Sequence, residues 1–187
     1  EWFLKTGRKA IIIPAYQDGA GLTPEADSGL GDYSPSGTLR AASVTTYNTA
    51  RAWILANTDY TIASTNVLWC QGENDAYQVA LGNITGADYE AALEALAAYW
   101  KAQISFDDMY VIQTGRKVSG NQDAGYTAIR DAQTAACTDS ANLTMTFTGA
   151  VAFAAAGKMV DDVHWDQVGL NEAGKGSAEL TAIDKGF

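Results

Sequence analysis

Short apolar runs and amphipathic stretches alternate along the chain. Four apolar runs have the length and residue types of β-strands, at residues 10–15, 66–70, 109–113 and 143–147. The first two are nearly continuous in apolar residues, which is typical of strands buried on both faces. The pattern therefore predicts a sheet whose strands are largely covered by other elements.

Apolar residues at helical spacing fill the intervals between these runs. Helices are predicted at residues 38–57, 89–104, 123–137 and 169–185, and residues 1–5 read as the end of another helix. The clearest is the second, because Thr85 and Asp88 before it have the form of a capping box. The last is weakened by Gly174 and Gly176.

Alternating strands and helices predict an α/β fold. The expected architecture is a three-layer α/β/α sandwich with a mainly parallel sheet, and without repeats or linkers we expect residues 1–187 to form a single domain. Ligands of such sheets bind beyond the carboxyl ends of the strands. The polar segments that follow the apolar runs, including the long loop at residues 17–37, should therefore meet at one edge.

Length, composition and net charge limit the classes of function that the chain can have. The chain has 187 residues, enough for a sizeable core, and 47% of them are hydrophobic. A net charge of -10 argues against a nucleic acid or an anionic membrane as the main partner. No stretch reaches the roughly 18 apolar residues of a membrane span. Cys70 and Cys137 are compatible with one disulfide or with two buried thiols.

The single histidine, His164, follows Asp161 by three residues. An aspartate at that distance can hold the Nδ1–H of the imidazole and leave Nε2 free as a general base. The alternative is that Asp161 and Asp162 are solvated turn residues and that His164 packs on Trp165. One histidine with scattered carboxylates does not make a zinc site.

Gly72 and Asn74 directly follow the apolar run at 66–70. Gly72 would let the backbone approach a ligand closely, and the Asn74 amide can donate a hydrogen bond. Two such donors would stabilise the oxyanion of acyl transfer. An ordinary turn with an Asn cap explains the same residues. Gly19, after the run at 10–15, could supply another backbone donor, although glycine after a strand is common.

Together these residues resemble the SGNH hydrolases, whose four blocks carry Ser, Gly, Asn and His in that order. Residues 72–75 match the G-x-N-D block, residues 161–164 match the D-x-x-H block, and Gly19 stands where the family has its oxyanion glycine. Residues 69–76 are similar to the W-x-Q-G-E-x-D-A segment of the sialate O-acetylesterase and plant-type carbohydrate esterase branch. Residues 130–133 resemble the R-x-A-Q segment of that branch.

The resemblance extends over essentially the whole chain and implies the flavodoxin-like SGNH hydrolase fold. It implies a serine esterase that removes O-acetyl groups from carbohydrate through an acyl-serine intermediate. His164 would be the base, oriented by Asp161, and Asn74 and Gly19 would donate to the oxyanion. No metal or organic cofactor is implied, and an extracellular or virion-associated location is expected. The residues expected to bind the substrate are Gln71, Gly72 and Glu73.

The chain departs from the family in lacking a G-D-S or G-Q-S-N block. Ser28 is the nearest look-alike, but it follows the second block instead of preceding it. In the family the serine ends a strand inside the sheet, and each buried backbone group left unpaired without it would cost about 1–3 kcal/mol. We therefore expect the strand to come from a preceding segment or from a partner chain.

Two rival hypotheses remain. A non-catalytic glycan-binding or structural module, for example of a secreted or virion protein, could retain the esterase fold. The missing serine favours it, whereas the retained His164, Asp161, Asn74 and Gly19 count against it. A lipase-like enzyme acting on fatty esters is disfavoured by the W-x-Q-G-E context.

Overall fold

Three parallel strands form the centre of the protein, whose computed structural model describes residues 1–119 and 123–186. The sheet has the order β1-β2-β3, with β1 at Asn66–Cys70, β2 at Asp108–Ile112 and β3 at Leu143–Phe147. All three strands run in the same direction, so their carboxyl ends meet at one edge.

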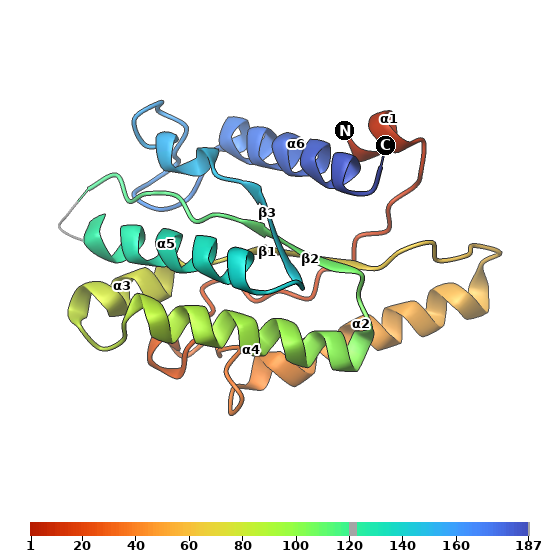
Figure 1. Ribbon diagram of the computed structural model, residues 1–187, viewed down its shortest axis with the longest axis horizontal. Helices are drawn as coiled ribbons and strands as arrows, with labels where there is room; N and C mark the ends of the chain where they lie inside the picture. The colour runs from red at the N-terminus through yellow and green to blue at the C-terminus, as the bar shows by residue number, and fades with distance from the viewer. Residues whose placement is uncertain (120–122, 187) are drawn as a thin grey trace.

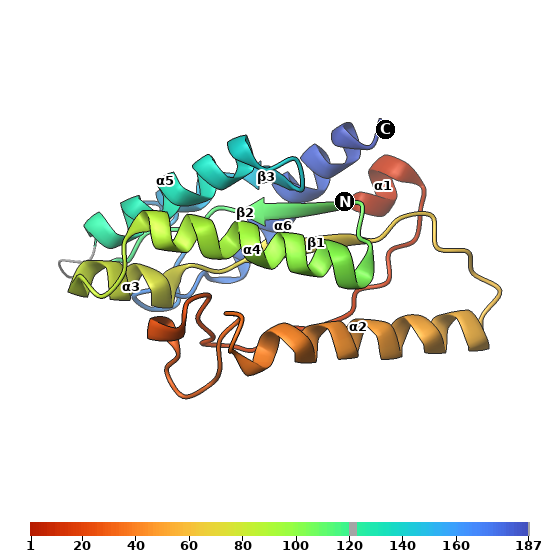
Figure 2. The same cartoon turned by 60° about the horizontal axis from the view of Figure 1, so that its bottom comes forward.

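Helices cover the sheet on both sides (Figure 1). Their bounds are α1 (Trp2–Thr6), α2 (Thr38–Asn57), α3 (Glu73–Leu81), α4 (Gly86–Ile104), α5 (Asp123–Asp139) and α6 (Gln167–Asp184), with short 3₁₀ turns η1 (Pro24–Ala26) and η2 (Gly149–Ala152). α1 and α6 lie on one side, and α3, α4 and α5 lie on the other, with α2 outside α4 (Figures 1 and 2). The structure is thus α/β with a parallel sheet between helical layers, in agreement with the predicted architecture.

The core lies between the sheet and the layer of α4 and α5. Met109 and Val111 of the central strand are fully buried. The rings of Tyr33, Trp69 and Trp100 meet edge to face, with centroids 5.3 to 5.8 Å apart. This aromatic cluster joins the long loop, β1 and α4, and so fixes the loop against the sheet.

Most of the predicted elements are confirmed. The predicted bounds are exact for two strands, at 66–70 and 143–147, and for the helix at 38–57. The other predicted helices and the strand β2 differ from their predicted bounds by a few residues, and α3 was not predicted. The capping box is also present, because the Thr85 hydroxyl accepts from the Asp88 N–H and the Asp88 carboxylate accepts from the Thr85 N–H.

The predicted strand at residues 10–15 is wrong. The segment is irregular, with Ile11 and Ile12 exposed to 53% and 86%. A strand needs a neighbour with which to exchange backbone hydrogen bonds, and in the described residues β1 pairs only with β2. Residues 11–14 instead line an open cavity of about 690 Å³ beside Trp53 and Ile54 of α2.

The expectation that β1 is buried on both faces is also wrong. Trp69 is 5% exposed, but Leu68 is 60% exposed on the opposite face. The outer edge of β1 has no backbone partner in the described part of the chain. Cys70 is exposed and Cys137 is partly buried, and the two are not joined by a disulfide. None of the described helices combines the length and the apolar character of a membrane span.

Candidate active site

Polar segments from three parts of the chain meet at the carboxyl edge of the sheet. The turn at residues 71–75 leaves β1 and enters α3, and the loop at residues 17–37 lies against α3 (Figure 2). The third segment is the loop that carries His164, between η2 and α6. The charges of Asp18 and Glu73, from the first two segments, contribute to raising the pKa of the His164 imidazole.

Local pairing shapes the loop that carries His164. Met159 and Trp165 form an antiparallel bridge, and the Trp165 ring packs edge-on against Phe153 with centroids 5.3 Å apart. The loop is tied to the segment after β2, because the Val118 N–H donates to the backbone carbonyl of Asp162 at 2.9 Å. Trp165 therefore anchors the loop in the core, while the His164 side chain stays 67% exposed.

His164 and Asp161 form a hydrogen-bonded pair. Nδ1 of the imidazole lies 2.8 Å from Oδ2 of Asp161. The other carboxylate oxygen accepts from the backbone N–H groups of His164 and Val163, at 2.8 and 2.9 Å. These bonds fix the carboxylate at the Nδ1 edge of the ring, and Nε2 has no hydrogen-bond partner among the described residues. The alternative in which Asp161 is only a solvated turn residue does not describe this geometry.

Hydrogen bonds and nearby charges set the pKa values of this pair. Hydrogen bonds from the His164 backbone and side chain, with one from Val163, lower the pKa of Asp161 to about 2. The hydrogen bond to Asp161 raises the pKa of His164, and the charges of Asp161, Asp18 and Glu73 raise it further. A carboxylate that stays ionised beside an imidazole of raised pKa is the arrangement that a general base requires.

Gly19 and Asn74 are in direct contact. Asn74 Nδ2 donates to the carbonyl oxygen of Gly19 at 2.5 Å, although the two residues are 55 positions apart. The amide has a second N–H to offer. Gly19 has a φ of +70°, which suits glycine, and its N–H has no partner in the described residues. The structure therefore brings the two predicted oxyanion donors together.

The turn from β1 into α3 requires glycine at position 72. Its φ of +152° and the nearness of Ile129, whose Cγ2 would lie 2.8 Å from an added Cβ, leave no room for a side chain. Glu73, the next residue, accepts a hydrogen bond from the Thr114 hydroxyl at 3.0 Å. The first turn of α3 is thus fixed against the end of β2.

Gln71 is oriented away from solvent. Its Nε2 donates to Asp75 at 2.6 Å and to the Ala20 carbonyl at 3.2 Å. Its backbone carbonyl accepts from Gln133, which is fully buried, and from the Tyr89 hydroxyl. Gln71 therefore supports the site through its neighbours. Sequence reasoning missed Asp75, Tyr89 and Gln133, because a polar side chain that is destined for burial looks like any other until the fold is known.

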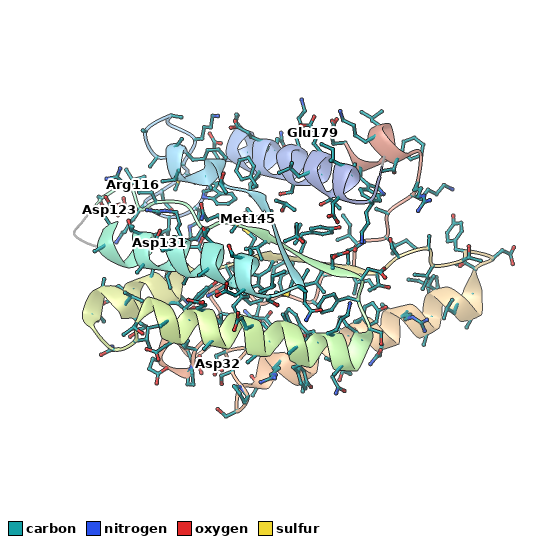
Figure 3. The ribbon with its side chains drawn as sticks, in the orientation of Figure 1. Asp32, Arg116, Asp123, Asp131, Met145 and Glu179 are labelled. Carbon is teal, nitrogen blue, oxygen red and sulfur yellow. The ribbon has the colours of Figure 1, made fainter. Side chains whose placement is uncertain are left out.

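An open cleft of about 720 Å³ lies beside the histidine loop. Its apolar wall is formed by Val118, Ala154, Met159 and Val163, and Asp161 lies at its margin. The nearby ion pair of Arg116 with Asp123 links the segment after β2 to the start of α5 (Figure 3). In the described residues no group of three or more His, Cys, Asp or Glu side chains could hold a metal ion.

The described structure assigns no serine to His164. The hydroxyl of Ser28 donates to the Gly19 carbonyl at 3.1 Å, so this residue lies beside the Gly19–Asn74 contact. Ser34 is buried and bonds to Ser36. None of these serines forms a hydrogen bond with the imidazole in the described part of the protein.

Comparisons with protein-family models, with curated proteins and with solved structures found no match.

Proposed function

We propose that the protein is the larger part of a serine esterase of the SGNH-hydrolase type. The observation that carries the proposal is the His164–Asp161 pair, whose Nε2 has no hydrogen-bond partner among the described residues. The charge of Glu73, which lies between Gly72 and Asn74, raises the pKa of His164. Asn74 also touches Gly19. A base, its orienting carboxylate and two donors are the parts that acyl transfer needs besides a nucleophile.

In the proposed reaction a serine hydroxyl attacks the carbonyl carbon of an acetyl ester, and His164 Nε2 takes the hydroxyl proton. Negative charge develops on the carbonyl oxygen, where the Gly19 N–H and the free N–H of Asn74 donate. The intermediate collapses, the sugar oxygen leaves with the proton from His164, and an acetyl-serine remains. Water then repeats the sequence with His164 as base and releases acetate.

The serine is proposed to arrive on a β-strand that pairs with the outer edge of β1. Among residues 1–119 and 123–186 that edge has no backbone partner and the apolar residues 11–14 form no backbone hydrogen bond, while Leu68 beside the edge is exposed. A strand added parallel to β1 would end at the edge of the sheet where His164 lies. It would give the unpaired backbone groups of β1 their hydrogen bonds.

The proposed substrate class is O-acetylated carbohydrate. It rests on the sequence resemblance at residues 69–76 and 130–133. The open cleft beside the histidine loop is compatible with a bulky sugar. An extracellular or virion-associated location is part of the same proposal.

The natural polypeptide is first characterised by its intact mass and by sequencing any residues before Glu1. Acetate release from acetylated oligosaccharides is then measured for that polypeptide and for His164→Ala and Ser28→Ala variants. We expect release that His164→Ala abolishes and Ser28→Ala leaves intact, with the required serine on the added strand. Loss of release in Ser28→Ala would instead place the nucleophile in the 17–37 loop. Retention of glycans without acetate release in any form would support the non-catalytic module.

A further inference from the structure

Asp75 has no part in the chemistry proposed above, yet its carboxylate is fully buried at 0% exposure in the first turn of α3. It accepts four hydrogen bonds. Oδ2 takes one from the Leu22 N–H at 3.0 Å and one from Gln71 Nε2 at 2.6 Å. Oδ1 takes two from Thr23, from the N–H at 3.0 Å and from the hydroxyl at 2.8 Å.

No Lys, Arg or His forms an ion pair with this carboxylate in the described structure. Burial raises the pKa of Asp75, and the hydrogen bonds from Leu22, Gln71 and Thr23 oppose that rise. The position of Asp75 in the first turn of α3 adds the favourable field of a helix N-terminus. The four donors therefore do the work that a counter-ion does elsewhere.

Two of the four donors are backbone groups of the 17–37 loop, and the hydroxyl of Thr23 is a third. Gln71, which donates to the same carboxylate, also donates to the Ala20 carbonyl. The loop is thus held at three of the four residues that follow Gly19. Asn74, which touches Gly19, is the residue before Asp75.

We infer that Asp75 is a positioning residue, which holds the 17–37 loop against α3 so that the Gly19 N–H and the Asn74 amide face one point. The inference rests on the proposed esterase function, because only that function gives the Gly19–Asn74 pair a task. Asp75 acts through its neighbours and does not touch the substrate.

The test is Asp75→Asn. An amide in place of the carboxylate turns one acceptor into a donor, and that donor would face either the Leu22 and Gln71 groups or the two Thr23 groups. Amide hydrogen exchange of Leu22 and Thr23 should accelerate roughly tenfold or more. In the serine-complete protein, kcat for an acetyl ester should fall roughly tenfold to a hundredfold with little change in KM.

A milder variant and a matched control accompany this test. Thr23→Val removes one donor and keeps the carboxylate, so it should give the same changes at smaller size if Asp75→Asn does not fold. Thr146→Val removes another fully buried hydroxyl, on β3, which donates to the Val111 carbonyl. It should lower stability without accelerating exchange at Leu22 and Thr23 and without a selective fall in kcat.

The exchange measurement and the activity measurement test the positioning role and the proposed esterase function separately. Unchanged exchange at Leu22 and Thr23 in Asp75→Asn overturns the positioning role whatever the activity. Accelerated exchange with an equal fall of kcat in Thr146→Val also overturns it, since the loss would then be general. If exchange accelerates but neither the serine-complete protein nor any variant releases acetate, Asp75 still holds the 17–37 loop. The proposed esterase function is then refuted.

Discussion

At the scale of single residues, Asp161 controls both the orientation and the charge of His164. The carboxylate holds Nδ1 at 2.8 Å and is itself held by two backbone N–H groups. The hydrogen bond to this carboxylate, and then its negative charge, raise the pKa of the imidazole, so the neutral form that can accept a proton is populated at higher pH than in free histidine.

The first prediction concerns Asp161→Asn. The pH profile of kcat/KM for the serine-complete protein should rise through a midpoint above 6.5, and the variant should shift that midpoint to lower pH because the anion is gone. The rate at the plateau should fall roughly 10²- to 10⁴-fold, because the ring loses its fixed tautomer. Asp59→Asn, an exposed aspartate before the amino end of β1, is the matched control. An unshifted midpoint in Asp161→Asn would contradict the assignment.

The second prediction concerns Gly72→Ala. The added Cβ would meet Ile129 Cγ2 at 2.8 Å, and a φ of +152° is unfavourable for alanine. We expect a loss of about 1–3 kcal/mol in the free energy of unfolding, measured by denaturant titration. Gly174→Ala is the control, because its Cβ meets nothing within 4 Å in the exposed interior of α6. That change should stabilise the protein by about 0.5–1 kcal/mol.

At the scale of elements, periodicity predicts the helices and strands that local sequence determines. It fails for those that depend on contacts with residues distant in the sequence. The helix α4 follows from its capping box and its apolar spacing, both of which are local. Helix α3 was missed because Gly72 and the polar residues after it read as a stop, whereas buried contacts of Asp75 and Ala76 stabilise it. Residues 10–15 have strand composition, but no described strand pairs with them.

The candidate site shows the same division. The separation of three positions between Asp161 and His164 suffices to predict their pairing, because the partners are close in sequence. Asn74 and Gly19 were each predicted as donors, but their contact was not predicted, because it spans 55 residues. The network of Gln71, Asp75 and Gln133 was not predicted, since burial of a polar side chain is a property of the packed fold.

The third prediction belongs to α4. Thr85→Ala removes the hydroxyl that accepts from the Asp88 N–H, and with it half of the capping box. The free energy of unfolding should fall by about 1 kcal/mol, measured by chemical denaturation. Thr45→Ala, in the exposed middle of α2, removes a hydroxyl without a capping role and should change stability by no more than a few tenths of a kcal/mol. Equal effects of both changes would refute the role of the cap.

At the scale of the whole molecule, the two outer strands of the sheet differ. β3 is covered by α5 and α6, and its Leu143 and Thr146 are buried. Leu68 of β1 is exposed, and the outer edge of this strand has no backbone partner in the described part of the chain. In the described residues each of these two strands pairs with β2 alone, but helices cover both faces of β3, whereas one face of β1 is exposed.

The fourth prediction follows from this asymmetry. Hydrogen exchange, measured by mass spectrometry, should be faster in β1 than in β2 when the chain is studied alone, because β1 has a single neighbour. Addition of the serine-bearing strand should slow exchange in β1 roughly tenfold or more. Exchange in α6, which packs on β3 and β2, should not change. Equal rates in β1 with and without the strand would refute docking at this edge.

The exposed edge of β1 also affects the solubility of the isolated chain. A strand with free backbone groups and apolar flanks is a template for another copy of itself. Preparations of this chain should scatter light increasingly as they are concentrated or warmed, and should form inclusion bodies when overproduced. A short peptide that occupies the edge should keep the same preparations clear.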